Sequence, residues 1–236
     1  MDNSETDILS ESARSYLRVR TQVEILYSQS VVAFIFPVIF SLIIGKVVWD
    51  IANRTFLIAW VVVVALFCVG RYLLLWSYIK IDRKKIDYHK WLTRINVAVF
   101  LSGAMWGIPG IILIPYHADA LIDFTLYNSL IMLTVCGIVA GSVISYSINL
   151  GTVFLYICPA LFPPAVYLIT LGDKYNSALG GFIMLYFIFI SLTAYKLNRQ
   201  LLAYAFKEYQ YQNIKTHYVR LKQKYEDLIK RIQQRQ

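Results

Sequence analysis

Five aromatic or amide side chains stand out because they fall in or beside apolar stretches interrupted by glycine and proline. They are Trp106, Tyr127, Asn128, Tyr146 and Phe154. Rings with a few hydrogen-bonding groups are typical linings of small-molecule sites. Enzyme chemistry would need other residues, and the sequence contains neither a G-x-S-x-G nor an H-E-x-x-H motif, which would provide a nucleophile or a zinc site. The pattern therefore predicts a binding pocket without a catalytic, metal or cofactor site.

The composition makes the bilayer the main solvent of this chain. Of its 236 residues, 58% are hydrophobic and only 16% are charged, unlike a water-soluble domain. A membrane-spanning helix needs about 20 apolar residues, and the stretches that provide them are 31–48, 56–77, 95–114, 121–147, 153–171 and 178–194. The sequence predicts an all-α integral membrane protein: a bundle of six transmembrane helices, preceded by an interfacial helix and followed by a coiled-coil helix.

Lysine and arginine are distributed unevenly about these stretches. Three precede the first stretch, six lie between the second and third, and ten follow from Lys196 onward, whereas only three lie on the opposite side. Positive charge is retained in the cytoplasm, so both termini are expected there. The predicted parts are a cytoplasmic interfacial segment (1–28), a membrane domain (29–196) and a cytoplasmic signalling helix (197–236). Because the charge follows the spans, nucleic acid is not expected as a partner.

Small residues recur at helical spacing within the apolar stretches. Gly103 and Gly107 form one G-x-x-x-G pattern, and Gly137 and Gly141 form another that Ser145 continues on the same face. Such faces allow two helices to approach closely. They could serve ordinary packing within one subunit, a dimer interface or a moving helix contact.

Prolines and one arginine complete the set of unusual residues in the apolar stretches. The prolines at positions 37, 109, 159, 163 and 164 favour kinks, which free backbone carbonyls and open crevices between helices. Arg71 lies near the end of the second stretch. We expect its long side chain to extend outward to the cytoplasmic interface; the alternative is a buried charge with a functional role.

The carboxyl-terminal segment has a different periodicity. Hydrophobic residues there alternate at steps of four and three, which gives the period of 3.5 residues typical of a left-handed coiled coil. They are Ile214, Tyr218, Leu221, Tyr225, Leu228 and Ile232. A helix of this length is marginal alone, so we expect a parallel homodimer through this segment.

Several of these features occur together in one known group of proteins. The sequence Gly-Ala-Met-Trp-Gly at 103–107, Pro115, Gly-Ile-Val-Ala-Gly at 137–141, and the segment from Phe154 to the Phe-Pro-Pro at 162–164 resemble the MASE-like multi-span sensor regions of bacterial histidine kinases and diguanylate cyclases. The resemblance implies a location in the bacterial inner membrane and a helix that leads into a signalling coil. The chain ends where such proteins continue, so we expect it to be truncated before an output domain.

The resulting hypothesis is a membrane-embedded input domain without a catalytic module. A small apolar ligand or a change in the surrounding lipid would shift the helices and pass a movement to the dimeric coil. Two other classes stay open: a small transporter or channel-like protein, which would show solute flux, and a membrane anchor for a partner bound to the coil. The scarcity of ionisable residues in the spans argues against transport.

Overall fold

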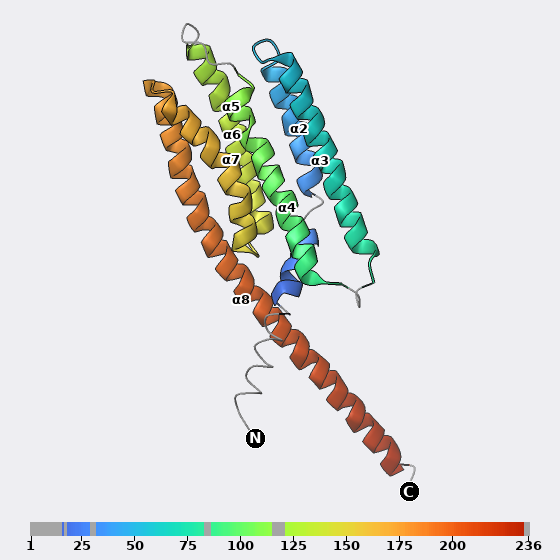
Figure 1. Ribbon diagram of the computed structural model, residues 1–236. Helices are drawn as coiled ribbons and strands as arrows, with labels where there is room; N and C mark the ends of the chain where they lie inside the picture. Colours follow the sequence, from blue (N-terminus) through green and yellow to red (C-terminus); the bar gives the residue numbers. More distant parts are fainter. Residues whose placement is uncertain (1–15, 17, 29–31, 83–85, 115–120, 234–236) are drawn as a thin grey trace. The chain divides into compact units, whose positions relative to one another are not determined.

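All regular structure in the described part of the chain is helical. The computed structural model describes residues 16, 18–28, 32–82, 86–114 and 121–233. A helix at residues 18–28, drawn without a label, precedes the helices labelled in Figure 1, which are α2 (Val32–Val47), α3 (Arg54–Lys80), α4 (Tyr88–Gly107), α5 (Pro109–Ile112), α6 (Leu121–Tyr146), α7 (Leu150–Thr170) and α8 (Lys174–Gln233). The chain divides into two units, Met1–Asn198 and Arg199–Gln236.

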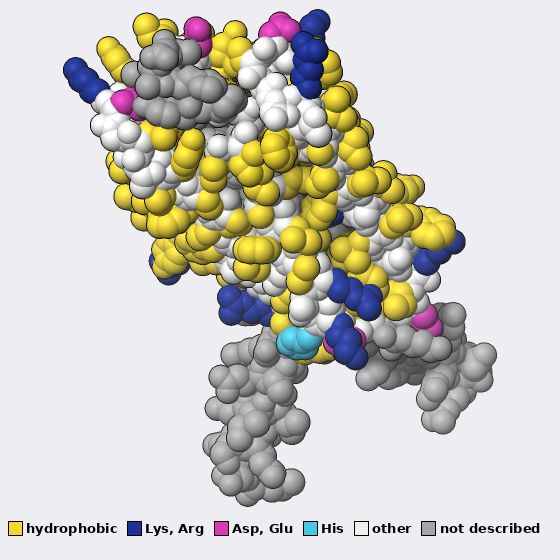
Figure 2. Space-filling model, turned by 45° about the horizontal axis from the view of Figure 1, so that its top comes forward, with side chains coloured by type: hydrophobic (Ala, Val, Ile, Leu, Met, Phe, Trp, Pro, Cys, Tyr) yellow, Lys and Arg dark blue, Asp and Glu magenta, His cyan; other side chains and the backbone are white. Residues whose placement is uncertain are grey.

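The chain is a multi-pass membrane protein. Five helical stretches are long and apolar enough to cross a bilayer: Arg54–Lys80, Tyr88–Ile112, Ile122–Tyr146, Leu150–Thr170 and Lys174–Ala205. The prediction of an all-α membrane protein is therefore confirmed, with five of its six spans. The apolar part of α2 among the described residues, Ile35–Val47, is shorter than the roughly 20 residues of a typical span, and residues 29–31 before α2 lie outside the described part. Hydrophobic side chains cover most of the face shown in Figure 2, and charged ones lie mostly toward its two ends.

Side-chain caps define where three of the helices begin. The Asn53 side chain accepts hydrogen bonds from Thr55 N and Phe56 N at the start of α3. Asn149 does the same for Gly151 N and Thr152 N at the start of α7. Each cap satisfies backbone donors that have no partner inside the helix.

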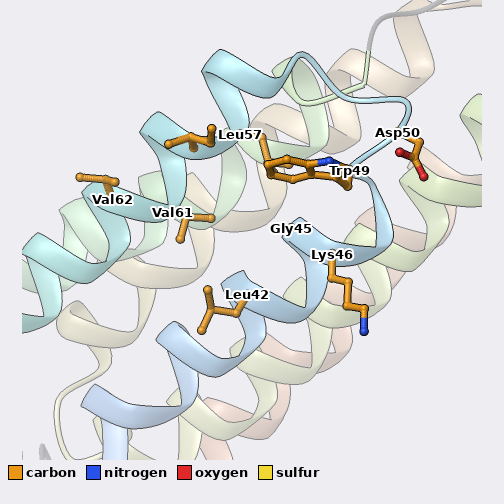
Figure 3. A pocket seen from close by; sticks show the side chains of 9 residues that line it. Leu42, Gly45, Lys46, Trp49, Asp50, Leu57, Val61 and Val62 are labelled. Carbon is orange, nitrogen blue, oxygen red and sulfur yellow. The ribbon is translucent and has the colours of Figure 1, made fainter.

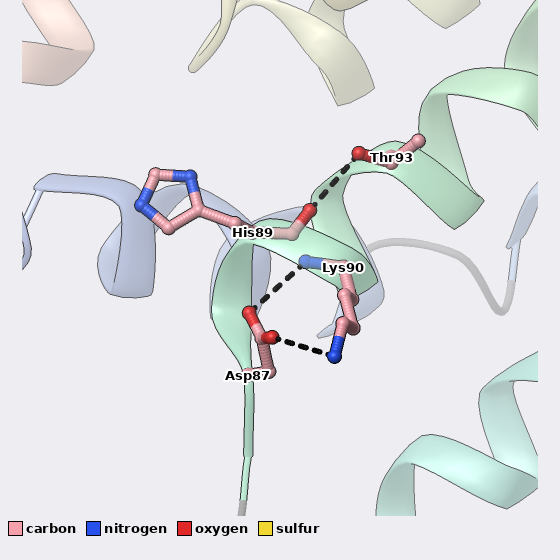
Figure 4. A network of polar contacts seen from close by, with 4 residues as sticks. All are labelled: Asp87, His89, Lys90 and Thr93. Carbon is pink, nitrogen blue, oxygen red and sulfur yellow. Dashed lines mark hydrogen bonds and ion pairs between the residues drawn. The ribbon is translucent and has the colours of Figure 1, made fainter.

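Polar contacts among neighbouring residues form a small network at the beginning of α4 (Figure 4). Asp87 Oδ1 accepts a hydrogen bond from Lys90 N at 3.2 Å, Asp87 Oδ2 lies 3.3 Å from Lys90 Nζ, and Thr93 Oγ1 donates to His89 O at 3.1 Å. This cap begins α4 at Tyr88, seven residues before the apolar stretch identified from hydropathy. The first turns of α4 are amphipathic and bury Tyr88 and Trp91, so apolar content alone places the start too late.

The helix at residues 18–28 is fixed to the same end of the bundle by aromatic rings. Tyr27 stacks on Tyr78 at 4.2 Å between ring centroids and meets Trp91 edge-on at 5.7 Å. Its hydroxyl donates to the Trp91 carbonyl at 3.4 Å. Val23 and Leu26 are also buried. This helix is therefore part of the folded membrane unit; most of the expected interfacial segment, 1–15 and 17, lies outside the described residues.

Helices α4 and α7 form the tightest contact in the membrane unit. A Cβ atom added to Gly103 would lie 2.3 Å from Tyr156 O, and one added to Gly107 would lie 2.2 Å from Pro159 O. Pro163 leaves the Pro159 carbonyl without a donor within α7. Gly107 therefore allows the α4 backbone to cover a carbonyl that a proline has freed, which keeps this polar group inside the protein and away from lipid.

The second unit, 199–236, consists of the remainder of α8. Its backbone is helical to Gln233, through all six positions of the predicted coil. Among those positions the structure describes only the Tyr218 side chain, which is 67% exposed. The homodimer stays a prediction.

The two glycine pairs provide a test of the packing. Gly103→Ala places a methyl group against the α7 backbone and should destabilise the protein by about 1–3 kcal/mol. Gly137→Ala is the matched control, because an added Cβ there meets nothing within 4 Å; it should leave stability nearly unchanged. Thermal unfolding of both variants in detergent measures the difference, and equal melting temperatures would contradict the close contact.

The Asp87 cap should give a pH-dependent start of α4. Hydrogen bonds from the backbone and side chain of Lys90 lower the pKa of Asp87. A lowered pKa means that the cap stabilises the helix above the unfolded-state value of about 4 and is lost as the pH falls through the folded-state pKa. Hydrogen exchange over 88–92 should show reduced protection in Asp87→Ala at neutral pH. Asp87→Asn keeps an acceptor and should remain protected in acid; acid-sensitive protection in that variant would argue against the titration.

Candidate ligand-binding site

A cavity of about 270 Å³ lies within the membrane unit. Residues from five helices line it: Phe36, Pro37 and Phe40 from α2, Arg71 from α3, Ser102 from α4, Gly137, Ile138, Gly141, Ser142, Ser145 and Tyr146 from α6, and Tyr156 from α7. It is slightly smaller than the range typical of drug-sized ligand pockets. A cavity shared by five helices changes shape when any one of them shifts.

Arg71 is the charged residue among the described lining. It is only 7% exposed, and its Nη2 donates a hydrogen bond to the Tyr146 hydroxyl at 3.0 Å. The guanidinium carbon also lies 6.0 Å from the Tyr146 ring centroid, within reach of a cation–π interaction. The expectation that Arg71 extends to the membrane interface is wrong, because hydroxyl and ring contacts hold it inside the bundle.

Other residues with hydroxyl groups line the same cavity. Ser102 and Tyr156 are buried and line the cavity from α4 and α7. The Tyr146 and Tyr156 rings lie 5.7 Å apart, so both phenols belong to one cluster. Ser142 and Ser145 add further hydroxyls on α6. An arginine among hydroxyls can donate several hydrogen bonds to one acceptor, which suits a carboxylate or phosphate.

The opposite side of the cavity is apolar and open. Phe36 is 52% exposed, and Gly137 and Gly141 are exposed with free space where a Cβ would stand. The second glycine pair therefore lines a groove, together with Ser145, whereas Gly103 and Gly107 form a helix contact. The two patterns have the same spacing but different surroundings.

One of the five residues expected to bind a ligand lines this cavity, and the expectation for the other four stays a prediction. Only Tyr146 lines the cavity. Trp106 is fully buried and packs edge-on against Trp60 at 5.5 Å, Tyr127 is half-buried, and Phe154 is 39% exposed on α7. Asn128 is 1% exposed. Among the described residues, neither its amide atoms nor Trp106 Nε1 has a hydrogen-bond partner, so both are places where water or a ligand would be stabilised.

Sequence reasoning missed Ser102 and Tyr156, and it named a buried functional charge at Arg71 only as the alternative. A buried charge in a span is by default a functional-site signal, and that signal was present at Arg71. Ser102 and Tyr156 carry no such signal, because serine and tyrosine are common in membrane helices. Only the packing of α4 on α7 brings them together.

Another hollow of about 450 Å³ lies between α2 and α3 (Figure 3). Its lining is mostly apolar, with Leu42, Leu57, Val61 and Val62, and also includes Lys46 and Asp50. Its exposed apolar walls are what lipid chains normally cover. We therefore place the candidate site at Arg71, where charge, hydroxyls and a cavity coincide.

The contact between Arg71 and Tyr146 should contribute measurably to stability. Tyr146→Phe removes the acceptor of a buried guanidinium and should cost about 1.5–3 kcal/mol, the range for hydrogen bonds to charged groups. Tyr186→Phe is the control, because the Tyr186 hydroxyl donates to a neutral group, Cys136 O, at 2.7 Å. Its cost should be about 0.5–1.5 kcal/mol. Denaturant unfolding in micelles compares them, and a larger loss in Tyr186→Phe would contradict the assigned contact.

Comparison with protein-family models, with curated proteins and with solved structures found no match. The sequence and the structure identify the chain as a multi-span helical membrane protein. A more specific function must be argued from its own residues.

Proposed function

We propose that this chain is the membrane-embedded sensory input domain of a bacterial signal-transduction receptor of the histidine kinase or diguanylate cyclase type. Occupancy of the Arg71 cavity is the input in this proposal, and movement of α8 is the output. The glycine and proline motifs that resemble MASE-like regions support the receptor class. The contacts of three consecutive residues at the end of α6 support the mechanism.

These residues are Tyr146, Ser147 and Ile148, and each contacts a different part of the membrane unit. The Tyr146 hydroxyl accepts the bond from Arg71 in the cavity. The next carbonyl, that of Ser147, accepts a hydrogen bond from Asn198 Nδ2 on α8 at 2.6 Å. The carbonyl of Ile148 accepts from Gln22 Nε2 at 3.3 Å. Tyr146, which contacts Arg71, is thus adjacent to Ser147, which binds α8.

The polar groups in this junction are well buried. Ser147 and Ile148 are 0% and 1% exposed, and Gln22 and Asn198 are 8% and 6% exposed. Asn149, which caps α7, also donates to Gln22 Oε1 at 3.4 Å. Buried hydrogen bonds of this kind are costly to break singly. A displacement at the end of α6 should therefore be transmitted to α8 and to the helix at residues 18–28.

Two features of α8 suit it to an output role. Its apolar part, Lys174–Ala205, is long enough to span the membrane. Tyr186 bonds to Cys136 O on α6, and Asn198 bonds to Ser147 O directly after α6. The helix then continues to Gln233, through the heptad positions that predict a parallel homodimer. We propose that α2 is the sixth crossing and that the termini are cytoplasmic, as the charge distribution favours. A ligand that distinguishes two packings by a few kcal/mol could shift such an equilibrium.

Cysteine crosslinking in membranes tests this function. In a background in which Cys68, Cys136 and Cys158 are replaced by serine, single cysteines at positions 214, 218, 221 and 225 should crosslink between subunits, and those at 215, 219 and 222 should not. A flat pattern would exclude the dimeric coil.

A substitution at the junction tests the coupling. Asn198→Ala removes the bond to Ser147 O and should change the crosslinking yield at the heptad positions by several-fold. The neighbouring Gln200→Ala, at an exposed position, serves as control and should leave it unchanged. Equal yields in both variants would count against transmission through Ser147.

A further inference from the structure

We propose that the Arg71 cavity binds a single-chain anionic amphiphile, which enters sideways from the bilayer. Its carboxylate or phosphate head would bind Arg71, and its apolar chain would lie along Gly137 and Gly141 beside the α2 phenylalanines. The site itself rests on the geometry of the cavity. Only its role as the stimulus rests on the proposed function.

The residues around Arg71 favour an anionic head group on the bound molecule. Arg71 presents a planar guanidinium whose paired donors match the oxygens of a carboxylate or phosphate. Ser102, Tyr146 and Tyr156 line the same cavity, and the Tyr146 hydroxyl lies 3.0 Å from Arg71 Nη2. Hydroxyls can donate to an anionic oxygen. An ammonium head would meet a like charge here. A neutral alcohol would forgo the charge-assisted bonds.

The position of Arg71 along α3 favours a single chain over a phospholipid. Arg71 lies nine residues before Lys80, the last residue of α3, which is about 14 Å along the helix at 1.5 Å per residue. An anionic group would therefore have to sink into the hydrocarbon region. A small head on one chain can reach this depth, whereas the glycerol and second chain of a phospholipid keep its phosphate at the interface. The cavity volume of about 270 Å³ also suits one head and part of one chain.

The shape of the open side accommodates the chain. Gly137 and Gly141 lie two and one helical turns before Ser145 on α6, and at both an added Cβ would stand in open space. Phe36, Pro37 and Phe40 form the facing wall on α2. Because Phe36 and both glycines are exposed, this groove communicates with the surface that lipid covers. An apolar chain there replaces lipid contacts and requires no aqueous entrance.

Equilibrium binding to the full chain in phosphatidylcholine nanodiscs tests the proposal. The probes are dodecanoate, dodecanol and dodecylammonium, which share one chain and differ in head charge. Dodecanoate should bind saturably, and roughly tenfold to hundredfold more tightly than either other probe, as expected for charge-assisted hydrogen bonds. Equal affinities for the three probes would overturn the assignment of the head group.

Substitutions locate the bound molecule. Arg71→Leu should remove the preference for dodecanoate over dodecanol. Gly141→Leu should fill the groove and lower the affinity for both probes. Gly70→Leu is the matched control, because Gly70 also has open space at its Cβ position but lies outside the cavity lining; its binding should be unchanged. If Arg71→Leu does not fold, the probe series on the unsubstituted protein still tests the head group, and Gly141→Leu still tests the groove. Equal binding in Gly141→Leu and Gly70→Leu would overturn the proposed groove.

Two further arms identify the source of the anion. Phosphatidylglycerol nanodiscs that abolish dodecanoate binding would show a bilayer phospholipid as the occupant, and competition by millimolar inorganic phosphate would show a water-soluble anion; either result would overturn the single-chain amphiphile. Crosslinking at position 218 separates the two proposals. Binding of dodecanoate without any change in crosslinking would refute the sensor function while leaving the site in place.

Discussion

The hydrogen bond between Arg71 and Tyr146 imposes the main constraint on this membrane unit. A guanidinium at membrane depth must be enclosed by protein or water, because lipid chains offer it no acceptor. Here α3 supplies the cation and α6 supplies the hydroxyl, while Ser102 and Tyr156 bring α4 and α7 to the same place. Helices in lipid gain little from the hydrophobic effect between them. A buried charge that several helices must enclose therefore has a large share in determining which helices are neighbours.

The polar groups at one end of the bundle follow the same rule. The connection between α6 and α7 carries no positive charge, which is unusual for a cytoplasmic connection under the proposed orientation. The structure explains this, because Ser147 and Ile148 are buried and their carbonyls bind Gln22 and Asn198. Protein covers this connection, so it needs no charged residues to face the aqueous phase. The contact with Asn198 also joins this connection to α8.

The sequence was sufficient for properties that depend on composition and local chemistry. Apolar stretches predicted the spans, although α4 begins at its Asp87 cap, earlier than the start predicted from hydropathy. The candidate site was less accessible, since its residues come from five helices and their meeting depends on packing. Arg71 shows the difficulty, because an arginine near the end of an apolar stretch has two physically sound outcomes, extension to the interface or enclosure. Choosing between them requires knowing that Tyr146 lies within reach.

The glycine pairs show why even a correct motif leaves its role undecided. Gly103 and Gly107 face a part of α7 with prolines at positions 159, 163 and 164, where a freed carbonyl favours the close approach of another backbone. Gly137 and Gly141 have the same spacing but face Arg71 and the α2 side chains across a cavity. A second helix pressed onto them would close the space around the guanidinium and its hydroxyls. The G-x-x-x-G spacing thus specifies only a smooth helix face, and the chemistry opposite decides whether a helix or a ligand covers it.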